Sequence, residues 1–204
     1  MARPRSADFD LQREQVLARA AQLFATRGYT ATTMQELAAA CGVSKATLYH
    51  YVQDKHALLA QITLGHVARL EDLVAQVRAR GLPAQDHLRE LILRFMQAYA
   101  QAQHEHRVLT EDVKFLDELE RQAVLDAQRR VVAAFATAIA ALRPELQAQQ
   151  LGKPLAMLLF GMINWTFTWL RPDGPFTHES LAPLVVQLFL GGLNALPAAA
   201  VAQP

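Results

Sequence analysis

Residues 44–51 carry side chains that are suited to reading DNA. They spell Ser-Lys-Ala-Thr-Leu-Tyr-His-Tyr, in which Leu48 alone is plainly apolar and is expected to face inward. Small or polar side chains of this kind reach base edges in the major groove and the phosphates beside it. We predict DNA contacts from Ser44, Lys45, Ala46, Thr47, Tyr49 and His50, with Ala46 placed to approach a thymine methyl group.

Two short helices must hold this segment. Thr33-Met-Gln-Glu36 is a capping box that opens a helix through Ala40. Gly42 then makes a turn, and Ser44 caps the second helix. This is the plan of a helix-turn-helix, whose second helix enters the major groove. Thr33, at a helix N-terminus, is predicted to offer its hydroxyl and free backbone N–H groups to a phosphate.

Lys55 stands in the first turn of the next helix, which Asp54 caps. The helix dipole disfavours a cation at that position, and a bound phosphate would reverse the penalty. We therefore predict a phosphate contact at Lys55. The alternative is a solvated surface lysine.

Helical periodicity continues along nearly the whole chain, and no short alternating run rich in Val, Ile and Thr predicts a strand. We predict an all-α fold of about nine helices. A three-helix helix-turn-helix domain occupies residues 1–53, a helical ligand-binding and dimerisation domain occupies 54–197, and 198–204 form a tail. A long helix is expected from Pro154 to Arg171 and a last one from Ser180 to Leu196.

The composition excludes several classes of protein. With 52% apolar and 19% charged residues, the 204-residue chain is a packed globular protein and not a disordered one. A single cysteine, Cys41, indicates a reducing cytoplasm, and nothing supports a redox switch there. Residues 155–170 are very apolar but interrupted by polar side chains, and a membrane span needs about 20 apolar residues. We expect a cytoplasmic protein without signal peptide or membrane segment.

Charge and motifs argue against two other functions. Residues 1–60 hold seven Lys and Arg against five Asp and Glu, whereas a protein that coats DNA regardless of sequence needs a large basic excess. The sequence has no phosphate-binding glycine loop, nucleophile elbow or His/Cys metal cluster, so no enzyme and no cofactor are predicted. His104 and His106 are two residues apart and do not share a helix face, so no metal site is predicted there.

The last two predicted helices are apolar nearly all round, which indicates packing on both sides. We expect one side to meet the body of the protein and the other a second copy of the chain. The alternative is that both helices are buried in the core of a single chain, which about 200 residues do not easily provide. The predicted dimer interface contains Trp165, Trp169, Leu184, Leu188, Gly191 and Gly192.

A ligand cavity is predicted between residues 54 and 170. Its candidate lining residues are His66, Phe95, Tyr99, Phe160 and Asn164. Each also has a plainer interpretation, because an apolar stripe at helical spacing is usually core, and a buried Asn or His is usually hydrogen-bonded within it.

Three stretches resemble the DNA-binding domain of the TetR family. They are Phe24-Ala-Thr-Arg-Gly-Tyr29, Thr32-Thr-Met-Gln-Glu-Leu-Ala38, and Gly42 to Lys55 followed by Leu58-Leu59. Val52 departs from the family's frequent phenylalanine. The resemblance covers about the first 60 residues. It implies DNA contacts at Thr33, Lys45, Thr47, Tyr49, His50 and Lys55, a homodimer on a palindromic double-stranded operator, and repression relieved by a ligand.

Toward the C-terminus a resemblance over about 40 residues narrows the expected inducer. Phe160-Gly-Met-Ile-Asn-Trp165, Trp169-Leu-Arg-Pro-Asp-Gly174 and Leu188-Phe-Leu-Gly-Gly-Leu193 are similar to repressors of fatty-acid, sterol and aromatic-acid breakdown that sense acyl-CoA thioesters. This implies a catabolic operon induced by a hydrophobic acyl-CoA. The alternative is a multidrug-type repressor of an efflux pump. A pocket for hydrophobic cations requires a buried acid, and the only acid that the last two predicted helices offer is Glu179, near an end.

Overall fold

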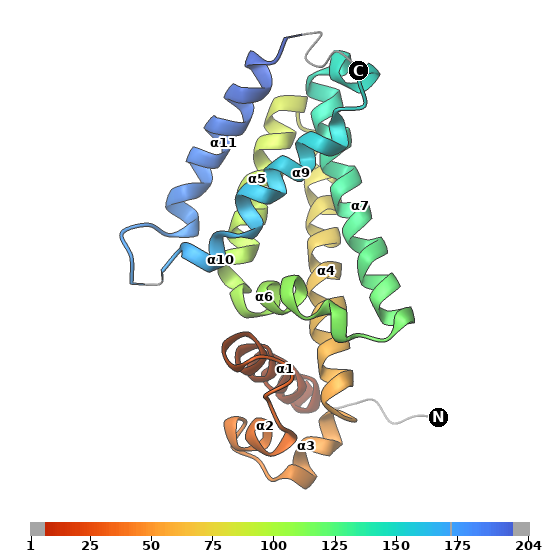
Figure 1. The fold of residues 1–204 in the computed structure, drawn as a ribbon, viewed down its shortest axis with the longest axis vertical. Coiled ribbons are helices and arrows are strands. Elements are labelled where there is room, and N and C mark those ends of the chain that lie inside the picture. The colour runs from red at the N-terminus through yellow and green to blue at the C-terminus, as the bar shows by residue number, and fades with distance from the viewer. Residues whose placement is uncertain (1–6, 172, 198–204) are drawn as a thin grey trace. The chain divides into compact units, whose positions relative to one another are not determined.

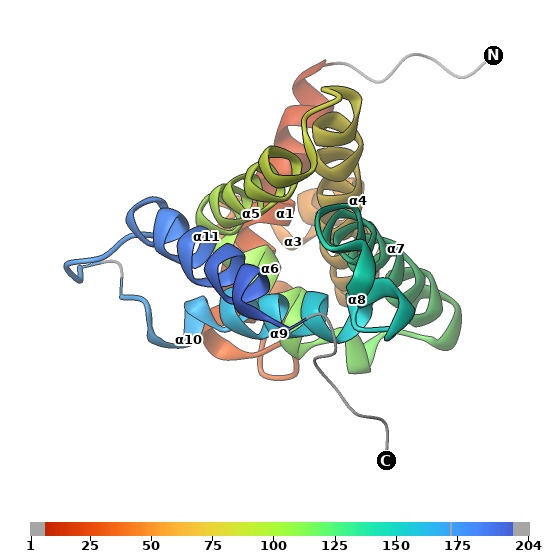
Figure 2. The same ribbon diagram turned by 90° about the horizontal axis from the view of Figure 1, so that it is seen from above.

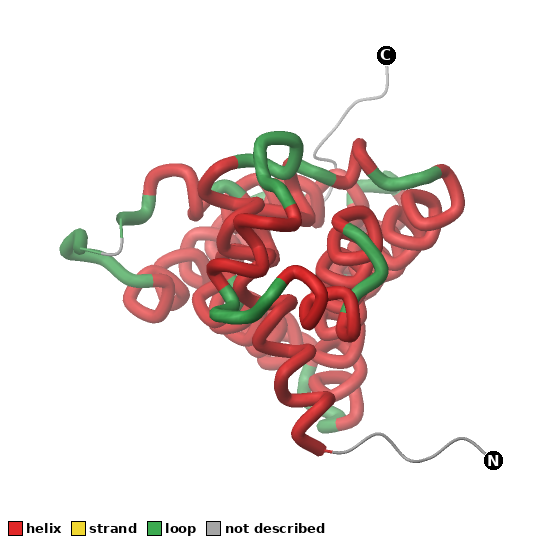
Figure 3. The backbone as a smooth tube through the Cα atoms, turned by 90° about the horizontal axis from the view of Figure 1, so that it is seen from below, coloured by secondary structure: helices red, strands yellow, loops and turns green. Residues whose placement is uncertain are grey.

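Helices are the regular elements of the part of the chain that the structure describes. The computed structural model describes residues 7–171 and 173–197, so the tail predicted at 198–204 lies outside the described residues. In these ranges the chain has no strand, and loops join helix to helix (Figures 1 and 3). The predicted all-α class is confirmed. The helices are α1 Ala7–Arg27, α2 Met34–Ala40, α3 Lys45–Tyr51, α4 Lys55–Ala79, α5 Ala84–Gln101, α6 Gln103–Glu111, a 3-10 turn η1 Val113–Phe115, α7 Glu118–Leu142, α8 Pro144–Ala148, α9 Gly152–Asn164, α10 Thr166–Trp169 and α11 His178–Ala195.

The chain divides into two compact units. The first contains residues 1–67 and 102–125, and the second contains residues 68–101 and those from 126 onward. Two of the three boundaries fall inside long helices, α4 and α7, so both helices contribute to both units, and the third lies between α5 and α6. The first unit thus adds α6 and the starts of α4 and α7 to the helix-turn-helix. The functional boundary predicted between residues 53 and 54 stays a prediction.

Local sequence signals explain how the helix-turn-helix forms. Gly28 ends α1 with φ of 91°, a left-handed conformation that glycine adopts without steric cost. The capping box is present: the Glu36 N–H donates to Thr33 Oγ1 at 3.2 Å, and the Thr33 N–H donates to Glu36 Oε2 at 2.9 Å. Gly42 makes the turn with φ of 67°, and Ser44 Oγ caps α3. These predicted signals are confirmed.

The second unit is built around Phe95 of α5. In this unit α5 and α11 lie side by side (Figure 2). The Phe95 ring contacts Phe135 of α7 and Phe160 of α9, with centroids 4.8 Å and 6.1 Å apart and the rings edge-on, the arrangement that aromatic pairs prefer. The buried side chains around them come from α4, α5, α7, α8, α9 and α11.

The C-terminal helices differ from the prediction in two places. The helix expected from Pro154 to Arg171 is interrupted at Trp165, so α9 and the short α10 replace it. The Thr166 hydroxyl contributes to the break, because it donates to the Ile163 carbonyl and also meets His178 Nε2 at 3.2 Å. The short helix α8 was not predicted from the sequence. In the described part of the chain no helix is long and apolar enough to cross a bilayer.

Candidate DNA-binding and ligand-binding sites

Helix α3 presents the predicted DNA-reading surface. Its one fully buried side chain is Leu48, as predicted, and it holds the helix against the core of the first unit. Tyr49 is 46% exposed. Lys45, Ala46 and His50 are also exposed. The helix therefore turns ammonium, phenol, imidazole and methyl groups outward, which are the groups that read a major groove.

Two of the predicted DNA contacts also cap helices. Ser44 Oγ accepts the Thr47 N–H at 3.0 Å and lies 2.8 Å from Thr47 Oγ1. The Thr33 hydroxyl donates to Glu36 Oε2 at 2.9 Å, and Arg27 pairs with the same carboxylate at 2.8 Å. Both hydroxyls are thus held at exposed helix N-termini, where backbone N–H groups favour an anion.

Lys55 is engaged within the protein. Its ammonium donates to the carbonyls of Tyr29 and Thr32 at 2.9 Å each and to that of Thr30 at 3.4 Å. It also lies 4.5 Å from the centroid of the Tyr29 ring. An ammonium has three donors, and here all three point at the turn between α1 and α2. The geometry thus supports a positioning role for Lys55, and the predicted phosphate contact stays a prediction.

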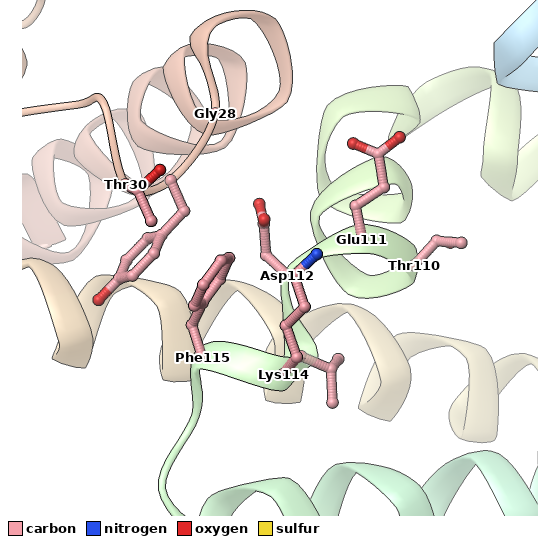
Figure 4. Close-up of a pocket in the computed structure, with 9 residues that line it drawn as sticks. Gly28, Thr30, Thr110, Glu111, Asp112, Lys114 and Phe115 are labelled. Atoms are coloured by element: carbon pink, nitrogen blue, oxygen red, sulfur yellow. The ribbon is translucent and has the colours of Figure 1, made fainter.

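A pocket of about 590 Å³ lies beside this turn, in the first unit. Residues 28–30 form one wall, and residues 110–115 of α6 and η1 form the other (Figure 4). The Tyr29 and Phe115 rings stack across it with centroids 5.2 Å apart. Asp112 is 8% exposed, and burial together with the neighbouring charge of Glu111 raises the pKa of its carboxyl to about 6. The pocket thus brings the turn between α1 and α2 beside an acid that is costly to ionise.

Asp112→Asn is expected to stabilise the protein near neutral pH. Because the folded pKa of about 6 exceeds the ordinary 3.8, the fold favours the protonated acid, and stability falls as pH rises from about 4 to 6. The amide has no charge to bury, so the variant should gain roughly 1–3 kcal/mol at pH 7.5. Urea unfolding at pH 4 and pH 7.5 measures this. The gain should vanish at pH 4, and an equal gain at both values would contradict the ionisation argument.

Four of the five predicted ligand residues gather in the second unit. Phe95, Tyr99 and Phe160 are buried there. The Tyr99 hydroxyl donates to Asn164 Oδ1 at 2.9 Å, and burial raises the pKa of Tyr99 well above its ordinary value, so the phenol keeps its proton. His66 belongs to the first unit, where its Nε2 lies 3.4 Å from His106 Nδ1 and both rings are buried. The structure therefore groups the aromatic residues with Asn164 and pairs His66 with His106.

The six predicted interface residues are all exposed in the single chain. The exposed fractions are 54% for Trp165, 56% for Trp169, 48% for Leu184 and 68% for Leu188. Gly191 and Gly192 are exposed as well, and a Cβ built on either meets no atom within 4 Å. Exposed large apolar side chains are typical of association surfaces, and the predicted interface stays a prediction. We call these six residues the apolar face.

Two groups of residues meet in the structure without having been predicted from the sequence. Asp112 and Phe115 come beside Tyr29 although more than 80 positions separate them in sequence, and no local motif signals that contact. His56 of α4 likewise meets Asp117 and Glu120 at the start of α7. The sequence shows only that Asp54 and Asp117 stand at N-cap positions of α4 and α7. An acid at an N-cap is ordinary and does not predict that the two helix starts meet.

The two units together indicate the class of protein. A helix-turn-helix with a polar, exposed second helix, joined to a helical unit with an apolar face, is a DNA-binding transcriptional regulator. Comparison with known proteins identifies the family. Residues 16–62 match the model for bacterial regulatory proteins of the tetR family, and residues 81–193 match the tetracyclin repressor-like C-terminal domain. The chain belongs to the TetR family, whose members are transcription factors and not enzymes.

Relatives and solved structures match along most of the chain. The transcriptional repressor KstR2 of Rhodococcus jostii is 25% identical over 89% of this chain and 91% of its own length. A TetR-family regulator from Bordetella parapertussis superposes with a TM-score of 0.83 at 36% identity, covering 91% of this chain and 97% of that one. The crystal structure of AibR in complex with isovaleryl coenzyme A and operator DNA has a TM-score of 0.74 at 27% identity, covering 87% and 97%.

Proposed function

We propose that this chain represses a catabolic operon as a homodimer and leaves its operator when it binds a hydrophobic acyl-CoA thioester. The single observation that carries the ligand class is the Tyr99–Asn164 pair among the aromatic side chains of the second unit. The similarity to KstR2, a repressor, and to AibR, solved with isovaleryl coenzyme A and operator DNA, supports the same class.

Asn164 has the chemistry to recognise a thioester. Tyr99 donates to its carbonyl oxygen, so the amide oxygen is engaged and the side chain is oriented. Its NH₂ group is left as the donor on that side chain, and a thioester carbonyl oxygen is an acceptor. Phe95 contacts both the Tyr99 ring and the Phe160 ring, with centroids 6.0 Å and 6.1 Å apart, and such rings are the apolar surface that an acyl chain needs. We therefore propose that Asn164 donates to the thioester carbonyl while the aromatic rings hold the acyl group.

DNA recognition is proposed at the exposed and half-buried positions of α3 and at the two helix caps. The side chains that would lie in the major groove are those of Lys45, Ala46, Thr47, Tyr49 and His50. Phosphates would be contacted by Thr33 and Ser44. Two such helices in a symmetric dimer would meet two half-sites about 34–36 Å apart. The apolar face, which runs from Trp165 at the end of α9 into α11, is proposed as the surface that forms the dimer.

Release of labelled operator DNA tests the ligand proposal. A hydrophobic acyl-CoA, aryl-acetyl or fatty, should lower operator affinity about 5- to 150-fold, which is the usual range of allosteric coupling, whereas free CoA and the free acid should not. Asn164→Leu should still bind the operator and respond much more weakly to the thioester. Leu119→Ala, at a leucine that is 84% exposed and lies outside the apolar face, is the control. An Asn164→Leu variant with an undiminished response would remove Asn164 from the site.

A multidrug-type sensor remains the second candidate, on one observation. The structure buries an acid, Asp112, beside the rings of Tyr29 and Phe115, and a carboxylate among aromatic rings is what a hydrophobic cation seeks. Release of operator DNA by cationic dyes and not by any acyl-CoA would replace the first proposal with this one. Asp112→Asn should then abolish the response to the dyes.

A further inference from the structure

We propose that His56, Asp117 and Glu120 form a binding site for one divalent transition-metal ion of the zinc class, within the first unit. Each of the three offers a ligand atom, and these atoms all lie within 4.8 Å of one another. This site is separate from the Tyr99–Asn164 pair, which belongs to the second unit, and it does not depend on the proposed inducer.

The geometry of the cluster suits a metal ion. The His56 Nε2 and Glu120 Oε2 atoms are 3.4 Å apart. Two ligands on a tetrahedral ion with bonds of about 2.1 Å stand roughly 3.4 Å from each other, so this pair already has the required spacing. Asp117 Oδ1 accepts the Glu120 N–H at 2.9 Å as a helix cap, which holds the second carboxylate at the cluster and leaves its other oxygen as a ligand.

One atom of the cluster indicates a missing partner. Glu120 Oε2 is shielded from solvent and accepts no hydrogen bond from the described residues. A buried carboxylate oxygen without a donor is unfavourable, and a bound cation removes that penalty. The His56 imidazole supplies a charge to this oxygen only when it is protonated. A metal ion would instead take the neutral imidazole nitrogen and the carboxylate together as ligands.

The donor set selects the kind of metal. One imidazole nitrogen with two carboxylates suits zinc and its neighbours, whereas Mg²⁺ and Ca²⁺ prefer oxygen ligands throughout. His56 and Glu120 have side chains 38% and 29% exposed, so water can supply a fourth ligand. Two helix N-termini face the site and each carries about half a positive charge, but the two carboxylates bring two full negative charges. The balance still favours a cation.

A metal at this position would act on the DNA-binding helices. His56 is the second residue of α4, which follows the recognition helix α3 after three residues, and Glu120 is the third residue of α7. The ion would therefore tie the first turn of α4 to the first turn of α7. We infer that zinc stabilises the first unit and changes operator affinity whether or not an inducer is bound.

Zinc titration of the tag-free full chain, dialysed against a chelator, tests the site. Calorimetry should show one Zn²⁺ per chain, and Co²⁺ should give the intense visible absorption of a four-coordinate ion. His56→Ala and Glu120→Gln should each weaken Zn²⁺ binding at least about tenfold, since even the loss of an outer-shell partner costs 10- to 100-fold. Circular dichroism of both variants verifies that they are folded.

Two matched controls complete the experiment. His104→Ala removes an exposed histidine of the same unit, and Glu118→Gln removes an acid next to the cluster; neither should change Zn²⁺ affinity. Wild-type affinity in His56→Ala or Glu120→Gln would overturn the proposal. So would Mg²⁺ or Ca²⁺ competing as well as Zn²⁺, because that result describes a diffuse acidic surface.

Discussion

Leu188→Glu is expected to yield a folded monomer that binds the operator poorly. Leu188 is 68% exposed in the single chain, so a carboxylate there meets water and the chain folds. In the proposed dimer the same position is covered, and a two-fold interface buries the substitution twice. Each unpaired buried charge costs several kcal/mol, which is enough to dissociate the dimer. Because the two half-sites are then bound separately, operator affinity should fall roughly a hundredfold or more.

The controls separate assembly from folding. Leu119→Glu places the same charge at a leucine that is 84% exposed and outside the apolar face, and it should remain dimeric with normal operator affinity. Trp169→Glu should behave as Leu188→Glu does. Sedimentation or size-exclusion chromatography with thermal melts gives mass and fold together. If both face variants remain dimers, the interface lies elsewhere on the chain.

Local signals made the helix-turn-helix predictable. The capping box at Thr33, the turn at Gly42 and the cap at Ser44 each work within a few residues, and each forms as expected. The outward position of Trp169 and Leu188 could also be predicted from the sequence, because a helix that is apolar all round in a chain of this size needs a second surface to cover it. The all-α class follows from the same periodicity.

Contacts between distant segments were not predictable. The break at Trp165 depends on a Thr166 hydroxyl that bonds back to its own helix and meets His178, and propensity alone favours one continuous helix there. Asp112 takes its pKa of about 6 from burial that only the folded chain creates. The pairing of His66 with His106 likewise joins α4 to α6 across 40 positions. A sequence pattern identifies such residues as inward but not what they meet.

Lys55 is a residue whose contacts in the structure differ from those that the sequence predicts. From the sequence, a cation in the first turn of α4 indicates a phosphate contact. In the structure its ammonium reaches the Tyr29 and Thr32 carbonyls at 2.9 Å and lies over the Tyr29 ring. The two roles predict different results. A phosphate contact sets the salt dependence of DNA binding, whereas a contact to the turn sets the stability and the position of α2.

Lys55→Met is therefore expected to lower the free energy of unfolding by about 1–3 kcal/mol, since carbonyls that accepted from a charged donor lose it while the apolar stem is kept. Operator affinity should fall because the turn leading to α2 is no longer held, but the slope of log affinity against log salt should not change. Lys45→Ala is the matched comparison. Lys45 is exposed on α3, so its loss should leave stability intact, weaken operator binding by roughly 1–3 kcal/mol and relax the preference at one base position. Urea unfolding and fluorescence polarisation at several salt concentrations distinguish the two lysines. If Lys55→Met reduces the salt slope by about one per subunit and leaves stability unchanged, Lys55 contacts a phosphate and does not hold the turn between α1 and α2.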